Sequence, residues 1–443
     1  MKRFVFYSAL LTLLTTHSLL VAQAQTIEPD SLRMQWFADA KLGIFIHWGI
    51  YSTGKTSESW AFHNKHITHS DYMEQIDEFT AVNYNPAIWA DLIQKSGARY
   101  AVITCKHHDG VALWDTKMNN LSTEKSSPAK RDVLSPFVDE LRKAGLKVGL
   151  YYSLIDWSYP DYPGFLKDSS RYTIADDPMR WQRFLKFCHG QIAELLGQYN
   201  PDLLWFDGDW EHSAEEWDAS GIRKMILNNN PNTIINGRLQ GYGDYDTPEQ
   251  NFPVSRPNLD YWELCMTTNE SWGYYLGDTN FKTPYEIISI FADCISMGGN
   301  LLLDIGPQSD GTIPREQVEI LTELGYWTHK HSEAIFESRA GISQGHFYGP
   351  TTISQDSTTL YLFLQGHQCG NVILKGLNNT IRSVEVLGNG TLLKHKVVGK
   401  ISWSKVPGLV YIDIPEGVQD KYMTVLKVTL EGPVSLYKGN GGL

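Results

Sequence analysis

Two acidic side chains of this sequence are placed where they could carry out hydrolysis. Asp207 directly follows the apolar run 203–206, so a buried strand would hold its carboxyl group at the strand end. A second carboxyl group should come from a later loop, where Glu249 and Glu263 are the candidates. Cleavage of a glycosidic bond needs such a pair, because one group attacks or stabilises the anomeric carbon and the other protonates the leaving oxygen.

The residues alone leave both positions open. Glu249 lies in a polar loop that could move with a substrate, although charged loop residues usually lie on the surface. Glu263 follows two aromatic residues, and burial there would raise its pKa and suit a general acid. Asp209 competes with Asp207, but Gly208 between them is expected to end the strand first. Asp207 could also merely cap a helix or pair with a local arginine.

Polar or aromatic side chains end or follow five successive apolar runs. The parallel strands of a (β/α)₈ barrel bring their carboxyl ends to one face, where the chemistry of such barrels lies. Five endings of this kind therefore predict a crowded polar site. The groups concerned are His47, His107 with His108, Tyr151, Asp207, and Arg238.

Several tryptophans could add flat apolar walls to this site. Each of them taken alone is explained as well by packing in the core. A sugar ring nevertheless offers CH faces to stack on and hydroxyls to bind, and apolar walls with a few placed polar groups are typical of small-molecule sites. The tryptophans are Trp48, Trp60, Trp157, Trp205, Trp210 and Trp272.

Alternating strands and helices from about residue 34 to 340 predict an α/β fold, a (β/α)₈ TIM-like barrel. An open doubly wound sheet is the alternative, but no GxGxxG motif follows the first strand. Short β-branched runs after about residue 345 predict a C-terminal antiparallel β-sandwich. We therefore expect a catalytic barrel at 25–340 and a sandwich at 341–443. The predicted strands cover 42–46, 100–104, 147–152, 203–206, 233–236 and 300–305, and the helices 87–96, 132–144, 179–198, 219–227, 284–297 and 316–334.

The N-terminus has the pattern of a secretory signal peptide over residues 1–24. Lys2 and Arg3 precede an apolar stretch, and Ala22 and Ala24 suit a cleavage site. The prediction is an exported protein, periplasmic or secreted, with an uncleaved membrane anchor as the alternative. Removal of the two basic residues would change the net charge from −12 to −14. Such a surface disfavours nucleic acid and anionic membranes as partners.

Neither the cysteines nor the histidines form a metal or disulfide motif. The five cysteines are widely spaced without a CxxC pair, so mostly buried free thiols are expected. His107 and His108 are adjacent, and adjacent residues on a strand point to opposite sides. No HxH or HExxH motif accompanies them, so we expect no metal and no cofactor. A metal-dependent amidohydrolase using one of these histidines, and a sugar-binding protein without turnover, remain the alternatives.

At these residues the sequence resembles the α-L-fucosidases of glycoside hydrolase family 29. The resemblance extends from about Met34 to Ser338, with a looser match in the sandwich. It implies a fucosylated oligosaccharide or glycan as substrate, two-step hydrolysis with retention, and no metal. It leaves the oligomeric state open. The segments that carry it are 42–49, 106–110, 205–208 and 298–303, with Gly306-Pro307 and Asp310-Gly311.

The resemblance also assigns roles to individual residues. Asp207 looks like the family nucleophile, and the Thr-Pro-Glu segment that ends at Glu249 looks like the acid/base loop, which favours Glu249 over Glu263. That segment also leans toward enzymes restricted to α-1,3/1,4-linked fucose. The positions that look like the fucose-binding set are His47, His107, His108, Tyr151, Trp205 and Arg238, with Trp60 and Trp272 as further walls.

The chain departs from the family pattern in its first loop. The family usually has Glu directly before the first-loop tryptophan. Here Ser59 precedes Trp60, and Glu58 stands one residue further back.

Overall fold

A computed structural model describes residues 29–368 and 370–439 of the chain, and the predicted signal peptide and Cys369 lie outside them. The larger part is built on a parallel sheet of seven strands in the order β7-β6-β3-β2-β1-β9-β8. The strands are β1 (Leu42–Ile46), β2 (Tyr100–Lys106), β3 (Lys147–Ser153), β6 (Leu203–Asp207), β7 (Ile234–Ile235), β8 (Glu263–Thr267) and β9 (Asn300–Ile305).

These strands form where the sequence has continuous apolar runs. Every residue of β1, β2, β6, β8 and β9 is buried, as expected for a parallel sheet covered on both faces. Large side chains fill the interior, and small residues make room for them. A Cβ atom on Gly43 would lie 2.3 Å from the Tyr100 ring, so only glycine fits there.

Helices follow most strands at the predicted places and begin at recognisable caps. Asn85 caps α4 ahead of Pro86, and Thr283 forms a capping box with Glu286 at the start of α10. The helix predicted over 316–334 is instead broken at His331. The longer helices are α1 (Pro29–Ala40), α4 (Pro86–Lys95), α6 (Leu134–Lys143), α7 (Pro178–Tyr199), α9 (Ala219–Asn229), α10 (Pro284–Ser296) and α11 (Arg315–Lys330).

Short elements occupy the connections. The short helices are α2 (Trp60–His63), α3 (His69–Met73), α5 (Thr123–Ser126), α8 (Ala214–Trp217), α12 (Ser332–Ile335), η1 (Ile50–Thr53), η2 (Glu74–Glu78) and η3 (Asp209–Glu211). A small hairpin pairs β4 (Gly164–Leu166) with β5 (Ser169–Ser170).

The segment 244–250 lies between the two edge strands β7 and β8. The Asp244 N–H donates to the Ile235 carbonyl at 2.7 Å, and the Gln250 N–H donates to the Cys265 carbonyl at 3.0 Å. Glu249 forms a parallel bridge with Cys265. Both edges of the sheet therefore contact one polar segment, and the domain is barrel-like.

The C-terminal part consists of two antiparallel sheets, as predicted. A six-stranded sheet has the order β10-β11-β12-β18-β14-β15, and a three-stranded sheet the order β13-β17-β16, with the short helix η4 (Glu416–Val418) between β17 and β18. The strands are β10 (Arg339–Ala340), β11 (Thr351–Ile353), β12 (Thr359–Leu364), β13 (Gly370–Leu374), β14 (Ile381–Val386), β15 (Thr391–Leu392), β16 (His395–Val398), β17 (Leu409–Ile414) and β18 (Thr424–Leu430).

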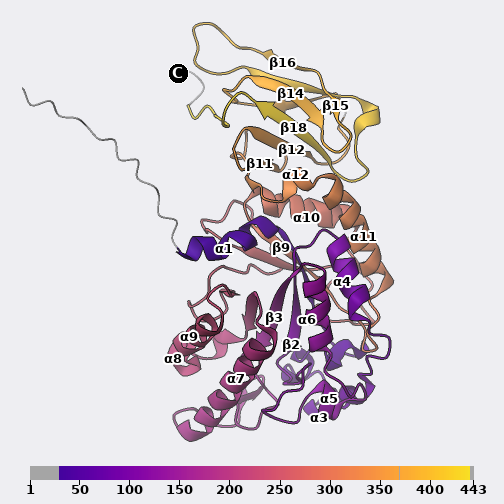
Figure 1. Ribbon diagram of the computed structural model, residues 1–443, viewed down its shortest axis with the longest axis vertical. Helices are drawn as coiled ribbons and strands as arrows, with labels where there is room; N and C mark the ends of the chain where they lie inside the picture. The colour runs from indigo at the N-terminus through magenta and orange to yellow at the C-terminus, as the bar shows by residue number, and fades with distance from the viewer. Residues whose placement is uncertain (1–28, 369, 440–443) are drawn as a thin grey trace, which may run out of the picture.

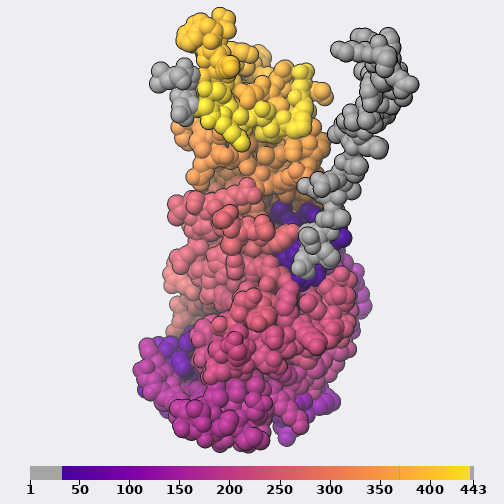
Figure 2. All heavy atoms as spheres, turned by 90° about the vertical axis from the view of Figure 1, so that its left-hand side faces the viewer, coloured from indigo at the N-terminus to yellow at the C-terminus, as the bar shows by residue number. Residues whose placement is uncertain are grey.

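The two parts of the chain share an apolar contact. Residues from both antiparallel sheets enclose one core, while Tyr361 and Phe363 on the other face of β12 belong to the core of the larger domain. Trp327 of α11 donates its indole N–H to the Met423 carbonyl at 2.9 Å. Figures 1 and 2 show the result: the antiparallel sheets form one end of the molecule, and Figure 1 shows them next to α10, α11 and α12.

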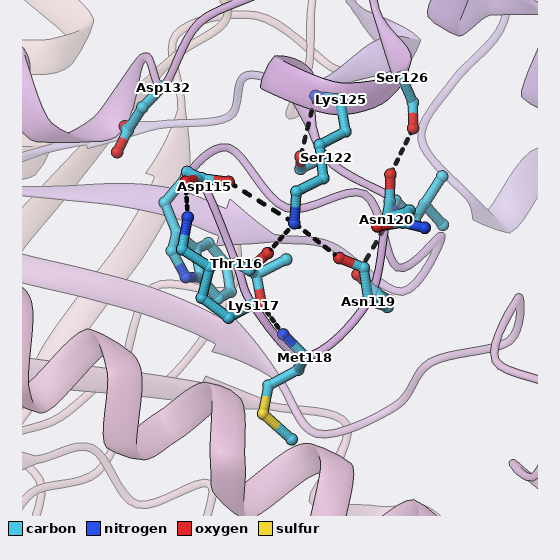
Figure 3. A network of polar contacts seen from close by, with 12 residues as sticks. Asp115, Thr116, Lys117, Met118, Asn119, Asn120, Ser122, Lys125, Ser126 and Asp132 are labelled. Carbon is cyan, nitrogen blue, oxygen red and sulfur yellow. Dashed lines mark hydrogen bonds and ion pairs between the residues drawn. The ribbon is translucent and has the colours of Figure 1, made fainter.

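Lys125 joins several residues of the connection between β2 and α6 (Figure 3). The Lys125 ammonium group donates to the carbonyls of Thr116 and Asn119, the latter at 3.0 Å, and lies 3.6 Å from the Asp115 carboxylate. Glu194 of α7 accepts the Trp114 indole N–H at 3.1 Å. These contacts fix the long segment that begins with His107 and His108.

Four cysteines are buried and free, as predicted: Cys105, Cys188, Cys265 and Cys294. No helix among residues 29–368 and 370–439 combines the length and apolar character needed to cross a membrane.

Candidate active site

The carboxylate of Asp207 lies at the carboxyl end of β6, where two donors hold it. The Tyr151 hydroxyl donates to Oδ2 at 2.9 Å, and Nη1 of Arg238 donates to Oδ1 at 2.7 Å. Burial raises the pKa of Tyr151 well above its ordinary value, with the charge of Asp207 adding to the effect, so the phenol keeps its proton. The Asn236 side chain fixes the strand end, because it binds both the N–H and the carbonyl of Phe206.

One guanidinium group joins Asp207 to Glu249. Nη1 of Arg238 binds Asp207, and Nη2 binds Glu249 at 2.6 Å. The group also stacks 4.5 Å above the Trp205 ring. Burial alone would lower the pKa of Arg238, but the neighbouring carboxylates raise it above its ordinary value. The two carboxyl groups therefore lie on either side of one permanently charged guanidinium group.

Three histidines lie at the same carboxyl end of the sheet, and each is anchored through its Nδ1 atom. His47 contacts Asp304 at 2.6 Å, His107 contacts Ser59 at 2.7 Å, and His108 contacts Ser153 at 2.6 Å. Burial is the main cause that lowers the pKa of all three, to about 3 for His108. Burial also raises the pKa of Asp304, which favours a neutral hydrogen-bonded pair with His47. The rings are thus uncharged at neutral pH.

The hydrogen bonds around His108 define its tautomer. The Ser153 hydroxyl donates to the Ile155 carbonyl at 2.6 Å, so Nδ1–H of His108 must donate to the Ser153 oxygen. Nε2 is then an acceptor; it is buried, has no hydrogen-bond partner, and lies 3.6 Å from Oδ2 of Asp207. A buried polar atom without a partner is costly, so this nitrogen is suited to accept a hydroxyl from a bound molecule.

Aromatic rings surround these polar groups as expected. The Trp272 ring centroid lies 5.0 Å from that of His47, and the Trp60 centroid 5.6 Å from that of His108. Tyr151 stacks on His107 with centroids 5.7 Å apart. All ten residues predicted for the site thus lie together at the carboxyl end of the sheet.

Glu263 lies elsewhere, inside the barrel-like domain at the start of β8. It is fully buried and accepts hydrogen bonds from the hydroxyls of Tyr100 and Tyr245 and from the Trp205 indole. Burial raises its pKa to about 7, as expected from its aromatic neighbours. Its carboxyl group accepts the indole N–H at the edge of Trp205, and Arg238 lies over the face of that ring.

In the first loop, Glu58 stands one residue earlier than the glutamate of the family pattern, yet it still contacts the site. Glu58 is buried and accepts the N–H of Gly273, next to Trp272, at 2.5 Å. Burial raises the pKa of Glu58. Ser59 takes the neighbouring position and binds His107. Glu58 thus holds the segment that carries Trp272.

Two expectations about neighbouring residues had different outcomes. The prediction that His107 and His108 point to opposite sides is wrong, because their ring centroids lie only 4.3 Å apart. The strand ends at Lys106 and the chain turns, so the pleat no longer alternates. The expectation that Gly208 ends the strand is confirmed, since its φ is 84° and Asp209 accepts the Gln240 N–H instead. Within the described part of the chain, no three His, Cys, Asp or Glu side chains are grouped to hold a metal ion.

Comparison with known proteins identifies the family. The family model described as alpha-L-fucosidase matches residues 15–333. The chain belongs to the α-L-fucosidase family. Human plasma α-L-fucosidase is 31% identical over 390 residues, which cover 80% of this chain and 81% of that protein. Membership of this family identifies a glycoside hydrolase, and not a metal-dependent amidohydrolase or a sugar-binding protein without turnover.

Solved structures of other family members share the fold. The α-L-fucosidase isoenzyme 1 from Paenibacillus thiaminolyticus superposes with a TM-score of 0.82 at 32% identity, covering 91% of this chain and 99% of that one. A family 29 α-L-fucosidase from Bacteroides thetaiotaomicron, trapped as a covalent intermediate with 2-fluoro-fucosyl fluoride, superposes with a TM-score of 0.80 at 26% identity, covering 90% and 96%.

Sequence reasoning missed the residues that orient the site of this fucosidase-family chain. Ser153 and Asp304 fix the tautomer and position of two histidines, and Thr247 accepts Nε–H of Arg238 at 3.1 Å. Asp304 stands next to last in a strongly apolar strand, which is the one signal that could have revealed it. Ser153 ends the third strand and Thr247 begins the Thr-Pro-Glu segment, but nothing in the sequence indicated that these two residues position others.

Proposed function

We propose that this protein is a retaining exo-α-L-fucosidase that releases terminal α-L-fucose from oligosaccharides or glycoconjugates. The observation that carries the proposal is the contact of one guanidinium group with both Asp207 and Glu249. Retaining glycosidases hold their two carboxyl groups roughly 5–5.5 Å apart. A single guanidinium group that contacts both carboxyl groups keeps them at a short separation of this kind. Family membership supports fucose as the sugar.

In the first step, Asp207 attacks the anomeric carbon and forms a glycosyl-enzyme bond. Tyr151 and Arg238 each donate a hydrogen bond to the carboxylate and fix its direction. Glu249 gives its proton to the leaving oxygen at the same time. Its side chain is 41% exposed, which leaves room for a leaving group beside it.

In the second step, Glu249 takes a proton from water and the hydroxide displaces Asp207. The two displacements together restore the original anomeric configuration. Arg238 contacts both carboxylates and stabilises whichever one bears the charge.

The remaining site residues are proposed to recognise the sugar ring. Neutral His47, His107 and His108 can each accept or donate a hydrogen bond without competing for the charge on Asp207. Trp60 and Trp272 offer faces for the CH groups of the ring. A sugar lacking the matching hydroxyls would leave buried partners unpaired and be rejected strongly.

Architecture and localisation complete the proposal. Segment 244–250 would serve as the eighth strand position of a (β/α)₈ barrel, supported by its bridges to both edge strands. The barrel would extend over 25–340 and the sandwich over 341–443. The pattern of residues 1–24 supports export, and the Thr-Pro-Glu segment supports a preference for α-1,3/1,4-linked fucose.

Azide rescue of the two alanine variants tests these roles. With an activated aryl fucoside, Glu249→Ala should form fucosyl azide of retained α configuration, because azide replaces water in the second step. Asp207→Ala should lose most activity, and any azide product should have the inverted β configuration. Rescue by azide of Glu263→Ala instead of Glu249→Ala would refute the assignment, and absence of fucose release by the wild type would refute the function.

A further inference from the structure

An exposed tryptophan stands at the rim of the candidate active site. Trp210 follows Asp207 by three residues, and half of its side chain is accessible to solvent. The described residues include 20 exposed large hydrophobic side chains, of which only Trp210 and Trp403 are tryptophans, and Trp403 lies in the sandwich. The indole therefore gains little from packing where it stands.

The backbone around Trp210 is held in place on both sides. The carbonyl of Asp209 accepts the Trp217 indole N–H and the Gln240 side-chain amide, each at 2.8 Å. Glu211 accepts the Trp157 indole N–H at 3.3 Å. The turn is thus rigid, and the exposure of Trp210 does not result from a loose loop.

The ring of Trp210 continues the aromatic wall of the site. It lies nearly parallel to Trp60, at 15° with centroids 6.4 Å apart, and nearly perpendicular to His108, with centroids 6.3 Å apart. Nε2 of His108 is the unpartnered acceptor 3.6 Å from Asp207. Trp210 therefore lies just outside the groups that would hold the fucose ring.

A hollow lies next to this wall. Its volume is about 680 Å³, and Glu211 and His212, which directly follow Trp210, form part of its lining. His63, stacked on Trp157 with centroids 4.0 Å apart, forms another part. Mixed carboxylate, imidazole and aromatic groups of this kind suit a neutral, hydroxyl-rich ligand.

We propose that Trp210 is the stacking platform for a sugar of the leaving group, with the adjacent hollow receiving the rest of the oligosaccharide. The inference rests on the proposed fucosidase function and deepens it: the substrate is a fucosylated oligosaccharide and not a simple fucoside. The flat indole face would contact the CH face of the sugar, which adds affinity without fixed hydroxyl recognition.

The test compares two substrates on the full chain. Fucosyl fluoride carries no leaving-group sugar, whereas a fucosylated trisaccharide or tetrasaccharide does. For Trp210→Ala, the ratio of kcat/KM on the oligosaccharide to kcat/KM on fucosyl fluoride should fall about tenfold, the effect of losing one aromatic contact. Trp210→Leu, which keeps apolar bulk against Trp60, should show the same fall, and Trp210→Phe should restore most of the ratio. Trp403→Ala, at the exposed tryptophan of the sandwich, should leave the ratio unchanged.

The outcomes separate this inference from the function beneath it. An unchanged ratio in Trp210→Ala and Trp210→Leu, or a loss shared equally by both substrates, would overturn the role of Trp210 while fucosidase activity stands. Failure of the wild type to hydrolyse either substrate would instead refute the proposed function.

Discussion

The buried carboxyl group of Glu263 should make the stability of this protein depend on pH. Burial raises its pKa from 4.5 to about 7, and the hydrogen bonds from Tyr100, Trp205 and Tyr245 only partly offset the cost of its charge. Between these values the folded protein keeps a proton that the unfolded chain releases. Folding therefore loses stability as the pH rises from about 4.5 through about 7.

The size of this loss follows from the pKa difference. Each pKa unit corresponds to about 1.4 kcal/mol, so a rise from 4.5 to about 7 amounts to about 3 kcal/mol in total. About 2.5 kcal/mol of it falls between pH 5 and pH 8. Glu263→Gln keeps the shape of the protonated group but has no proton to release, so this part of the pH dependence should disappear.

Urea denaturation at pH 5 and pH 8 measures the effect. The wild type should lose about 2.5 kcal/mol more unfolding free energy over this interval than Glu263→Gln does. Glu416→Gln, at an exposed glutamate of the sandwich, serves as the control and should follow the wild type. Parallel pH profiles for the wild type and Glu263→Gln would refute the reasoning.

Two further substitutions test the contact of Arg238 with both carboxyl groups and the packing of Gly43 against Tyr100. Arg238→Lys replaces a planar fork by a single ammonium group that cannot bind Asp207 and Glu249 in the same way, so kcat/KM should fall about tenfold to hundredfold; an unchanged value in a steady-state assay would contradict the bridging role. Gly43→Ala places a Cβ atom 2.3 Å from the Tyr100 ring and should cost about 1–3 kcal/mol of unfolding free energy; a urea midpoint equal to that of the wild type would show that the ring can move aside.

The sequence predicts those parts of the fold whose residues are mostly apolar. The strand at 42–46 and the strand at 300–305 are found with the predicted bounds, because a parallel strand buried on both faces is a largely apolar run. The polar residues near the ends of the second strand, Asn300 and Asp304, leave its apolar centre recognisable. In the sandwich, β17 (Leu409–Ile414) has the other recognisable pattern, because buried residues alternate with more exposed ones along it. The same rule places Asp207 at a strand end without knowledge of its partners.

Other parts depend on contacts that leave no pattern in the sequence. Glu249 was expected in a loop free to move, yet its backbone bridges to Cys265 of β8, and the polar residues of that segment give no strand signal. Strand β8 itself begins with Glu263, whose charge hides a buried strand from any apolar count. The turn after Lys106 brings two histidine rings together against the expectation of alternation.

The architecture of the site follows from a problem of charge. A nucleophilic carboxylate must stay ionised in a place that is nearly dry, so it needs positive charge, but three protonated histidines would over-stabilise it and weaken its attack. Burial keeps His47, His107 and His108 neutral and leaves Arg238, among the described residues, as the one cation that directly contacts Asp207. Because the same guanidinium group also contacts Glu249, it can follow the negative charge from one carboxyl group to the other as the reaction proceeds. This arrangement requires a platform that holds the cation still, and Trp205, whose indole N–H donates to Glu263, supplies it.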